Sequence, residues 1–287
     1  MLFVNSEANM AYSLKIKNTY GIDLTATFEC GQCFRFNKIN DSKYKAEYTG
    51  IVRKKLLRIA DDGEFLYLNS TDEEFKTVWL DYLGLSEDYD SIHNEILSAS
   101  DNEALRSAIK QGSGIRILKQ DPWEAVCSFI ISQNNNIPRI KGLVEALSRA
   151  SGEKIDDGIY AFPSPEAVLS LGEDGLRALK VGFRAPYIYD AAKCFAEKTV
   201  TPDVIRALAT DEAAKKLSEI KGIGPKVAAC ALLFGFSRYD AFPIDVWMKR
   251  VLKEHFSPDF DPSSLGRYAG IAQQVLFYSI RESQVTR

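Results

Sequence analysis

Histidine and cysteine are scarce in this sequence. Only two histidines, His93 and His255, occur among the 287 residues, and five cysteines are scattered through a chain too long to need disulfide bonds for stability. Cys30 and Cys33 form a CGQC motif, but no second pair of Cys or His residues lies at metal-ligand spacing. An iron–sulfur cluster would need four clustered cysteines. We therefore expect no metal, and we interpret the two cysteines as strand residues rather than a redox pair.

Long apolar runs and a strong net charge are also missing. No apolar run reaches the ~18 residues needed to span a membrane, and the N-terminus lacks the pattern of a secretion signal. We expect a soluble, intracellular protein, located in the cytoplasm or nucleoid of a bacterium or in the nucleus of a eukaryote. The net charge is −3, whereas many nucleic-acid-binding domains are basic. Binding to nucleic acid would therefore have to rest on local backbone and side-chain sites.

The first third of the chain has the patterns of β-strands. Residues 33–39, 43–52 and 56–70 alternate in polarity or run apolar. Asp62 and Gly63 interrupt the last of these segments with a dipeptide that favours a hairpin turn. These features predict an antiparallel sheet.

Helical patterns dominate the rest of the chain. A helix is expected from about residue 71, where Thr71 and Glu74 have the spacing of a capping box. From about residue 86 the pattern is almost wholly helical, broken by short segments rich in Gly, Pro and Asn. The sequence predicts an α+β protein, with a sheet domain and flanking helices over residues 1–112 and an all-helical core over residues 113–287.

A glycine-rich turn lies between two of these helices, within residues 216–250. Gly222 and Gly224 flank an isoleucine, and Pro225 occupies the position where proline favours a helix start. Backbone N–H groups at such a turn and at a helix N-terminus can bind a phosphate without reading sequence. The pattern is typical of a helix-hairpin-helix that holds one DNA strand, although an ordinary helix–turn–helix connection remains open.

Lys226 follows this turn, in the first turn of the expected helix. The helix dipole is positive there and disfavours an ammonium group. An apolar, positively polarised environment favours the neutral amine that a lysine nucleophile requires. Asp245, at the start of a later helix, is either an N-cap or a carboxylate that stabilises positive charge beside the lysine, and both roles are compatible.

At this point the residues resemble a known family. The stretches GQCFRF, DPWEAVCSFIISQNNNIPRI, VGFRAPYI, GIGPKVAAC, FPIDV and AQQVLFYS are similar, in order, to those of the 8-oxoguanine DNA glycosylases of the helix-hairpin-helix superfamily. The resemblance implies a monomeric, bifunctional DNA glycosylase and β-lyase of base excision repair, without metal or organic cofactor. Its partner would be duplex DNA carrying 8-oxoguanine opposite cytosine. Lys226 would attack the anomeric carbon and Asp245 would stabilise the cationic sugar.

The resemblance also implies a base pocket. Cys230 and Phe277 would sandwich an extruded purine, and Gln273 would hydrogen-bond its Watson–Crick edge. The backbone carbonyl of Gly31 would accept the N7–H that 8-oxoguanine has and guanine lacks. Spacing alone would predict core positions for Cys230, Gln273 and Phe277 and a turn position for Gly31.

Four further residues resemble those that contact the opposite strand. Asn134 would enter the space left by the extruded base, Arg139 and Arg184 would hydrogen-bond the unpaired cytosine, and Phe183 would be an aromatic wedge. The alternatives are an inter-helix linker for the asparagine run, because Asn tolerates left-handed backbone, and a solvated helix face for Arg139.

Two positions depart from the animal-type members of the family. Trp247 stands where they carry a histidine, and Ala229 where they carry an acidic residue before the stacking cysteine. The first puts one phosphate contact in doubt, and the second removes a charge near the pocket. Two other functions remain open: an alkylated-purine glycosylase of the same superfamily, which would not need Lys226, and a non-catalytic protein that binds DNA structures through the hairpin.

Overall fold

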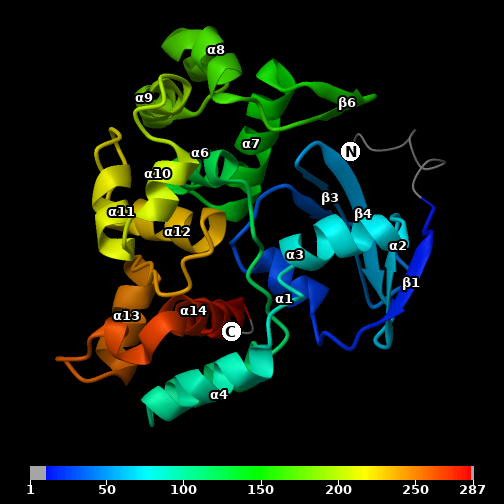
Figure 1. Cartoon of the computed structure of the whole chain (residues 1–287), viewed down its shortest axis with the longest axis vertical. Coiled ribbons are helices and arrows are strands. Elements are labelled where there is room, and N and C mark those ends of the chain that lie inside the picture. Colours follow the sequence, from blue (N-terminus) through cyan, green and yellow to red (C-terminus); the bar gives the residue numbers. More distant parts are fainter. Residues whose placement is uncertain (1–10, 286–287) are drawn as a thin grey trace.

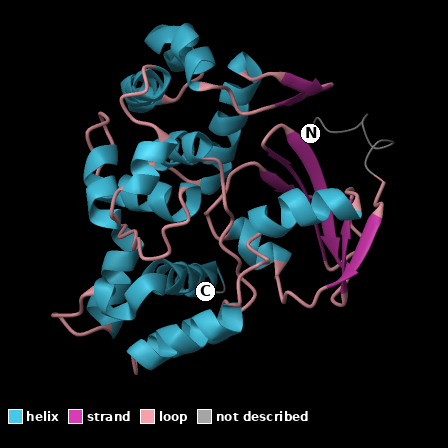
Figure 2. Cartoon of the chain, viewed as in Figure 1, coloured by secondary structure: helices cyan, strands magenta, loops and turns pink. Residues whose placement is uncertain are grey.

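The computed structural model describes residues 11–285, with a sheet on one side and helices forming most of the rest (Figures 1 and 2). Five strands form an antiparallel sheet in the order β1-β5-β4-β3-β2. Their bounds are β1 Leu14–Lys17, β2 Phe36–Lys38, β3 Ala46–Val52, β4 Lys55–Asp61 and β5 Phe65–Leu68. The predicted antiparallel sheet is confirmed, including a β4–β5 hairpin that turns at Asp62 and Gly63.

The first part of the chain contains two elements that the sequence patterns did not predict. The edge strand β1 pairs with β5 in a register that aligns Leu14 with Leu68, but its four residues are too few for alternation to be distinctive. Helix α1, Leu24–Glu29, begins where Asp23 accepts a hydrogen bond from the Ala26 backbone N–H. Cys30 ends this helix and Cys33 lies in the following turn, so their interpretation as strand residues is wrong.

A helix covers one face of the sheet. It consists of α2 Asp72–Glu74, a π-helical segment Phe75–Trp79 and α3 Leu80–Tyr82 (Figure 1). Thr71 accepts a hydrogen bond from the Glu74 backbone N–H, which confirms one half of the predicted capping box. Buried Phe75 and Trp79 pack with sheet residues in one apolar cluster. Burial of this face stabilises the sheet at roughly 25 cal/mol per Å² of apolar surface.

The remaining helices share a second and larger apolar cluster. They are α4 Tyr89–Ala99, α5 Glu103–Gln111, α6 Pro122–Ser132, α7 Ile137–Ser151, α8 Pro165–Ala178, α9 Ala185–Ala196, α10 Pro202–Ala207, α11 Thr210–Leu217, α12 Pro225–Gly235, α13 Val246–His255 and α14 Ala269–Val285, with short 3₁₀ segments at Gly182–Arg184 and Pro262–Tyr268. A small hairpin of β6 Lys154–Asp156 and β7 Ile159–Tyr160 interrupts the helical region. None of the helices between residues 11 and 285 combines the length and apolar character needed to cross a bilayer.

Two contacts join the sheet part to helix α14 near the end of the described chain. The Gln274 side-chain amide donates to the Cys30 carbonyl at 3.1 Å, and Arg281 Nη1 donates to the Glu29 carbonyl at 2.9 Å. These bonds hold the end of α1 and the glycine that follows it against α14. The packing therefore brings Gly31 to residues more than 200 positions away in the sequence.

Candidate active site

Helices α11 and α12 are joined by the glycine turn that the sequence indicated. Gly222 has a φ of +82°, and a Cβ atom at this position would lie 2.2 Å from the ring of Tyr187. Only glycine fits both the left-handed backbone and this close approach. Gly224 is the N-cap of α12 and has open space around its Cα. The turn therefore places Gly224 and the N-terminus of α12 at the surface, as the helix-hairpin-helix prediction requires.

Lys226 lies in the first turn of α12, and its side chain extends towards the C-terminal end of α6. Its Nζ lies 3.4 Å from the hydroxyl of Ser132 and 5.5 Å from the ring centroid of Phe129. The Ser132 hydroxyl donates to the Phe129 carbonyl at 2.8 Å, which leaves its lone pairs available to the amine. Ser132 was not predicted as a site residue, because a serine at the end of an apolar helix has an ordinary sequence context.

Asp245 is the N-cap of α13, as predicted: its Oδ1 accepts a hydrogen bond from the Met248 backbone N–H at 2.8 Å. The carboxylate also lines the same cavity as Lys226. Helix capping uses one oxygen of a group that can accept several hydrogen bonds. The structural role and a role beside the lysine are therefore compatible.

The predicted base-pocket residues converge on this cavity. It has a volume of about 50 Å³ and adjoins an open groove of about 500 Å³. The cavity is lined by Cys30, Gly31, Phe129, Lys226, Cys230, Phe234, Pro243, Asp245, Gln273, Gln274 and Phe277. Gly31, Lys226, Asp245 and Phe277 line the groove as well, so the two spaces form one recess. All four predicted pocket residues thus lie beside the lysine.

The chemistry of the recess suits a planar, polar-edged group. Burial raises the pKa of the Cys230 thiol, although nearby Lys226 opposes this effect, so the sulfur remains neutral and soft. Gln273 is 5% exposed, and within residues 11–285 no hydrogen bond joins its side-chain amide to another residue. Gly31 has a φ of +84°, and Phe277 would lie 3.6 Å from a Cβ added there. The recess offers an aromatic face, a sulfur face and an unpaired amide.

The residues predicted to contact the opposite strand lie around the start of α7. Asn134 is exposed and has a left-handed backbone with a φ of 48°, as the linker interpretation expects of asparagine. Arg139 is exposed in the first turn of α7, and Phe183 is 50% exposed. Asn134 also lines a second groove with Gly224 and Lys226. The position of these side chains leaves them accessible to a ligand.

Arg184 makes contacts that the sequence did not predict. It is 3% exposed, and its guanidinium donates to the backbone carbonyls of Gln133, Asn134 and Val181. The guanidinium also lies 4.4 Å from the ring of Phe183. In this structure Arg184 therefore holds the backbone of the asparagine run, and its predicted contact to a cytosine stays a prediction.

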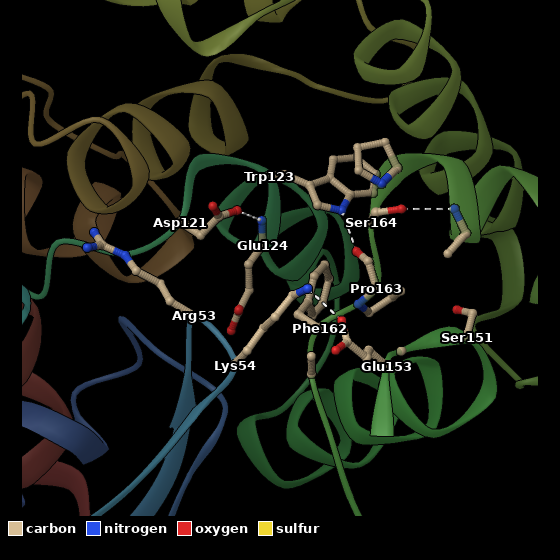
Figure 3. Close-up of a pocket in the computed structure, with 14 residues that line it drawn as sticks. Arg53, Lys54, Asp121, Trp123, Glu124, Ser151, Glu153, Phe162, Pro163 and Ser164 are labelled. Carbon is tan, nitrogen blue, oxygen red and sulfur yellow. Dashed lines mark hydrogen bonds and ion pairs between the residues drawn. The ribbon is translucent and has the colours of Figure 1, made fainter. Parts of the chain in front are cut away.

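A larger cavity lies at the opposite, N-terminal end of α6 (Figure 3). Its volume is about 750 Å³, and its lining includes Arg53, Trp123, Glu124 and Phe162. None of the predicted site residues lines it. The Lys54 ammonium and the Glu153 carboxylate form an ion pair of 2.5 Å at this cavity.

Glu124 in this cavity should make stability depend on pH. Burial raises the pKa of its carboxyl from 4.5 to about 7; Arg35 opposes the rise and Asp121 adds to it. Because the folded pKa lies above the unfolded value, the group's contribution is complete below about pH 4.5 and is lost as pH rises through about 7. Glu124→Gln should change stability by less than about 1 kcal/mol at pH 5 and raise it by about 2 kcal/mol at pH 8, allowing for partial solvent contact.

Urea unfolding at pH 5 and pH 8 measures this difference. Glu103→Gln is the control, because the Glu103 side chain is 89% exposed. A Glu124→Gln advantage that is equal at the two pH values would show that the carboxyl does not titrate as expected.

The five cysteines are free thiols in the part of the chain that the structure describes. No group of three or more His, Cys, Asp or Glu residues there is arranged to hold a metal ion. Burial raises the pKa of the Cys30 thiol to about 11 and that of Cys33 well above its ordinary value, and neither forms a disulfide. Neither of the two is a reactive thiolate near neutral pH.

Comparisons with known proteins agree with this site. Residues 14–126 match the N-terminal domain of 8-oxoguanine DNA glycosylase, and residues 127–266 match the HhH-GPD superfamily of base excision DNA repair proteins. The chain is 27% identical to N-glycosylase/DNA lyase OGG1 of Arabidopsis thaliana, over 96% of this chain and 81% of that protein. It is 30% identical to a probable N-glycosylase/DNA lyase of Methanothermobacter thermautotrophicus, over 64% of this chain and 69% of that protein.

A solved structure extends the likeness to the whole fold. The 8-oxoguanine glycosylase/lyase of Clostridium acetobutylicum, in complex with double-stranded DNA containing cytosine opposite 8-oxoguanine, is 33% identical with a TM-score of 0.83. The match covers 95% of this chain and 99% of that one. This chain therefore belongs to the 8-oxoguanine DNA glycosylase family of the HhH-GPD superfamily, and it is an N-glycosylase with DNA lyase activity.

Proposed function

We propose that this enzyme excises 8-oxoguanine opposite cytosine from duplex DNA and then cuts the strand by β-elimination, in base excision repair. The observation that carries the proposal is the convergence of Lys226 and Asp245 with Gly31, Cys230, Gln273 and Phe277 on one recess. The relatives named as N-glycosylase/DNA lyases and the DNA complex of the Clostridium enzyme support the choice of substrate.

Lys226 would supply the nucleophile. Its nitrogen forms a bond to C1′ of the extruded nucleotide, the bond from C1′ to the base breaks, and the electron pair leaves with the base, which takes up a proton. Loss of a proton from the nitrogen and opening of the sugar ring give an imine. Removal of a C2′ proton then expels the 3′ phosphate, and water later releases the lysine. Asp245 would stabilise the positive charge on the sugar electrostatically.

The recess would recognise the lesion by one hydrogen and by stacking. The N7–H of 8-oxoguanine can donate to the Gly31 carbonyl, whereas N7 of guanine is an acceptor that this carbonyl would repel. Gln273 has an unpaired amide for the Watson–Crick edge, and Cys230 and Phe277 would contact the two faces. A site built on a hydrogen bond rejects an analogue that lacks the donor.

The DNA backbone and the opposite base would be held by other elements. The hairpin N–H groups around Gly222 and Gly224 would bind a phosphate, which needs little net positive charge. Asn134 would fill the vacated space in the duplex, with Arg139, Arg184 and Phe183 at the unpaired cytosine.

Single-turnover excision tests the substrate. Matched duplexes would carry 8-oxoguanine, guanine or an alkylated adenine opposite their usual partners. We expect rapid base release and strand cleavage only with 8-oxoguanine. Release of the alkylated base without strand cleavage would instead favour an alkylated-purine glycosylase, and tight binding without base release from any duplex would favour a non-catalytic role.

Arg139→Ala should relax the choice of opposite base. Its exposed guanidinium can donate to O2 and N3 of cytosine, whereas adenine presents a donor at N6. Loss of this contact should reduce the preference for cytosine over adenine about tenfold or more, equivalent to about 1–3 kcal/mol. The measurement is the single-turnover rate with each of the four bases opposite the lesion. A variant that keeps the full preference would remove Arg139 from this role and leave the lysine chemistry untouched.

A further inference from the structure

An exposed tryptophan lies directly beside the candidate catalytic residues. Trp247 is 39% exposed and Val246 is 79% exposed, and both follow Asp245 at the start of α13. The other two tryptophans of the chain, Trp79 and Trp123, are 1% and 7% exposed. Large aromatic side chains normally bury most of their surface. Trp247 and Val246 therefore place exposed apolar surface next to Asp245.

Trp247 borders both grooves that meet at Lys226. One groove, of about 500 Å³, also contains Gly31 and Phe277 of the base recess. The other, also of about 500 Å³, contains Asn134 and Gly224 of the hairpin. Lys226, Asp245 and Trp247 line both grooves. The indole ring thus stands where the base recess passes into the groove that would face the duplex.

The polar surroundings of the ring are also suited to a nucleic acid. The Arg250 guanidinium carbon lies 5.3 Å from the ring centroid of Trp247, and Lys249 lines the hairpin groove. The Trp123 indole N–H donates to the Pro163 carbonyl. The Trp247 indole N–H has no hydrogen-bond partner among residues 11–285 and, unlike the buried and also unpartnered N–H of Trp79, it belongs to an exposed ring. The ring therefore presents an apolar face, an unused donor and an adjacent cation.

We propose that Trp247 is a strand-binding residue: its ring packs against the deoxyribose next to the extruded nucleotide, and its N–H and Arg250 contact the adjoining phosphates. The inference rests on the proposed function, because a strand that places C1′ at Lys226 and leaves the duplex beside Asn134 must cross from one groove to the other. Trp247 lies at that crossing. The contact to the sugar is apolar, whereas the contact from Arg250 is ionic.

These two kinds of contact make different predictions. Trp247→Ala should weaken duplex binding about tenfold with little change in its salt dependence, since removing an exposed aromatic face from water has an effect of this order. Trp247→Phe should retain affinity within about threefold, because a ring is preserved. Arg250→Ala should reduce the slope of log affinity against log salt by about 0.9, because one counterion fewer is released.

Tryptophan fluorescence tests the proposal directly, since Trp247 is the exposed tryptophan and the other two are buried. The wild type would be titrated with a duplex carrying an uncleavable abasic analogue opposite cytosine, while the anisotropy of a dye on the DNA reports binding. We expect the emission of the wild type to shift to shorter wavelength, because the Trp247 ring leaves water, and we expect little shift in Trp247→Phe at equal saturation. Val204→Ala is the control, because Val204 is 43% exposed on α10, away from these grooves.

The outcomes separate this inference from the proposed function. Unchanged Trp247 fluorescence on a saturating duplex, or full affinity in Trp247→Ala, would overturn the inference even if 8-oxoguanine is excised normally. A shift of the emission to shorter wavelength together with a tenfold loss of affinity in Trp247→Ala would support it even if another lesion proves to be the substrate. Failure of the wild type to bind the duplex would overturn both.

Discussion

Lys226→Gln should abolish strand cleavage of a duplex with 8-oxoguanine opposite cytosine, lowering the single-turnover rate on the order of 10⁴-fold or more. Removing a nucleophile has effects of at least this size in other enzymes. The glutamine amide nitrogen cannot attack C1′, and it cannot form an imine. Neither base release nor β-elimination should therefore proceed by the proposed route.

A neighbouring lysine provides the control for this experiment. Lys249 lines the hairpin groove together with Lys226 but belongs to α13. Lys249→Gln should reduce affinity for DNA and leave the cleavage rate at saturation close to the wild-type value. Lys226→Gln should still bind the duplex, measured by anisotropy. Cleavage at an undiminished rate by saturated Lys226→Gln would show that another group is the nucleophile.

Asp245→Asn should bind damaged DNA but excise the base slowly, at a rate about 10²–10³-fold lower than the wild type. Loss of one group that stabilises a transition state electrostatically has an effect of this size. Asparagine is an N-cap as good as aspartate, so the bond to the Met248 N–H and helix α13 should persist. The substitution thus removes the charge and keeps the cap. Single-turnover rates and dissociation constants measured on the same duplex separate the two effects.

Asp245→Ala gives the comparison that isolates the cap. It should lose about 1 kcal/mol of stability in addition to the rate, because the hydrogen bond to the Met248 N–H is lost. If Asp245→Asn lost binding and turnover in equal measure, the carboxylate would act mainly through the structure of α13. If Asp245→Asn retained full activity, the electrostatic role would be wrong.

Local rules account for the parts of the fold that the sequence predicted well. The turn at Asp62 and Gly63, the glycine turn before α12 and the N-cap at Asp245 each depend on a few adjacent residues. Strand β1 and the β6–β7 hairpin were not predicted, because four, three and two residues are too short for a periodic pattern. The cysteines after α1 were misplaced because a six-residue helix has little periodicity of its own.

The site was harder to predict than these parts of the fold, because it depends more on tertiary packing. Lys226 was identified from its unusual position in the first turn of a helix. No local pattern places Gly31 beside Gln273 and Phe277, because this contact depends on the packing of α14. Those three positions came from the family resemblance rather than from spacing. No sequence pattern predicts the contact of Ser132 with the Lys226 amine or the hydrogen bond from Arg184 to the Asn134 carbonyl. Both depend on how the helices pack together.

Trapping with borohydride tests the central claim most directly, since it reduces an imine between protein and sugar to a stable amine. The wild type, mixed with a duplex containing 8-oxoguanine opposite cytosine, should give a covalent protein–DNA adduct, and peptide mapping should place the link on Lys226. Lys226→Gln should give none. An adduct of equal yield in Lys226→Gln, or a link that maps to another amine, would contradict the account.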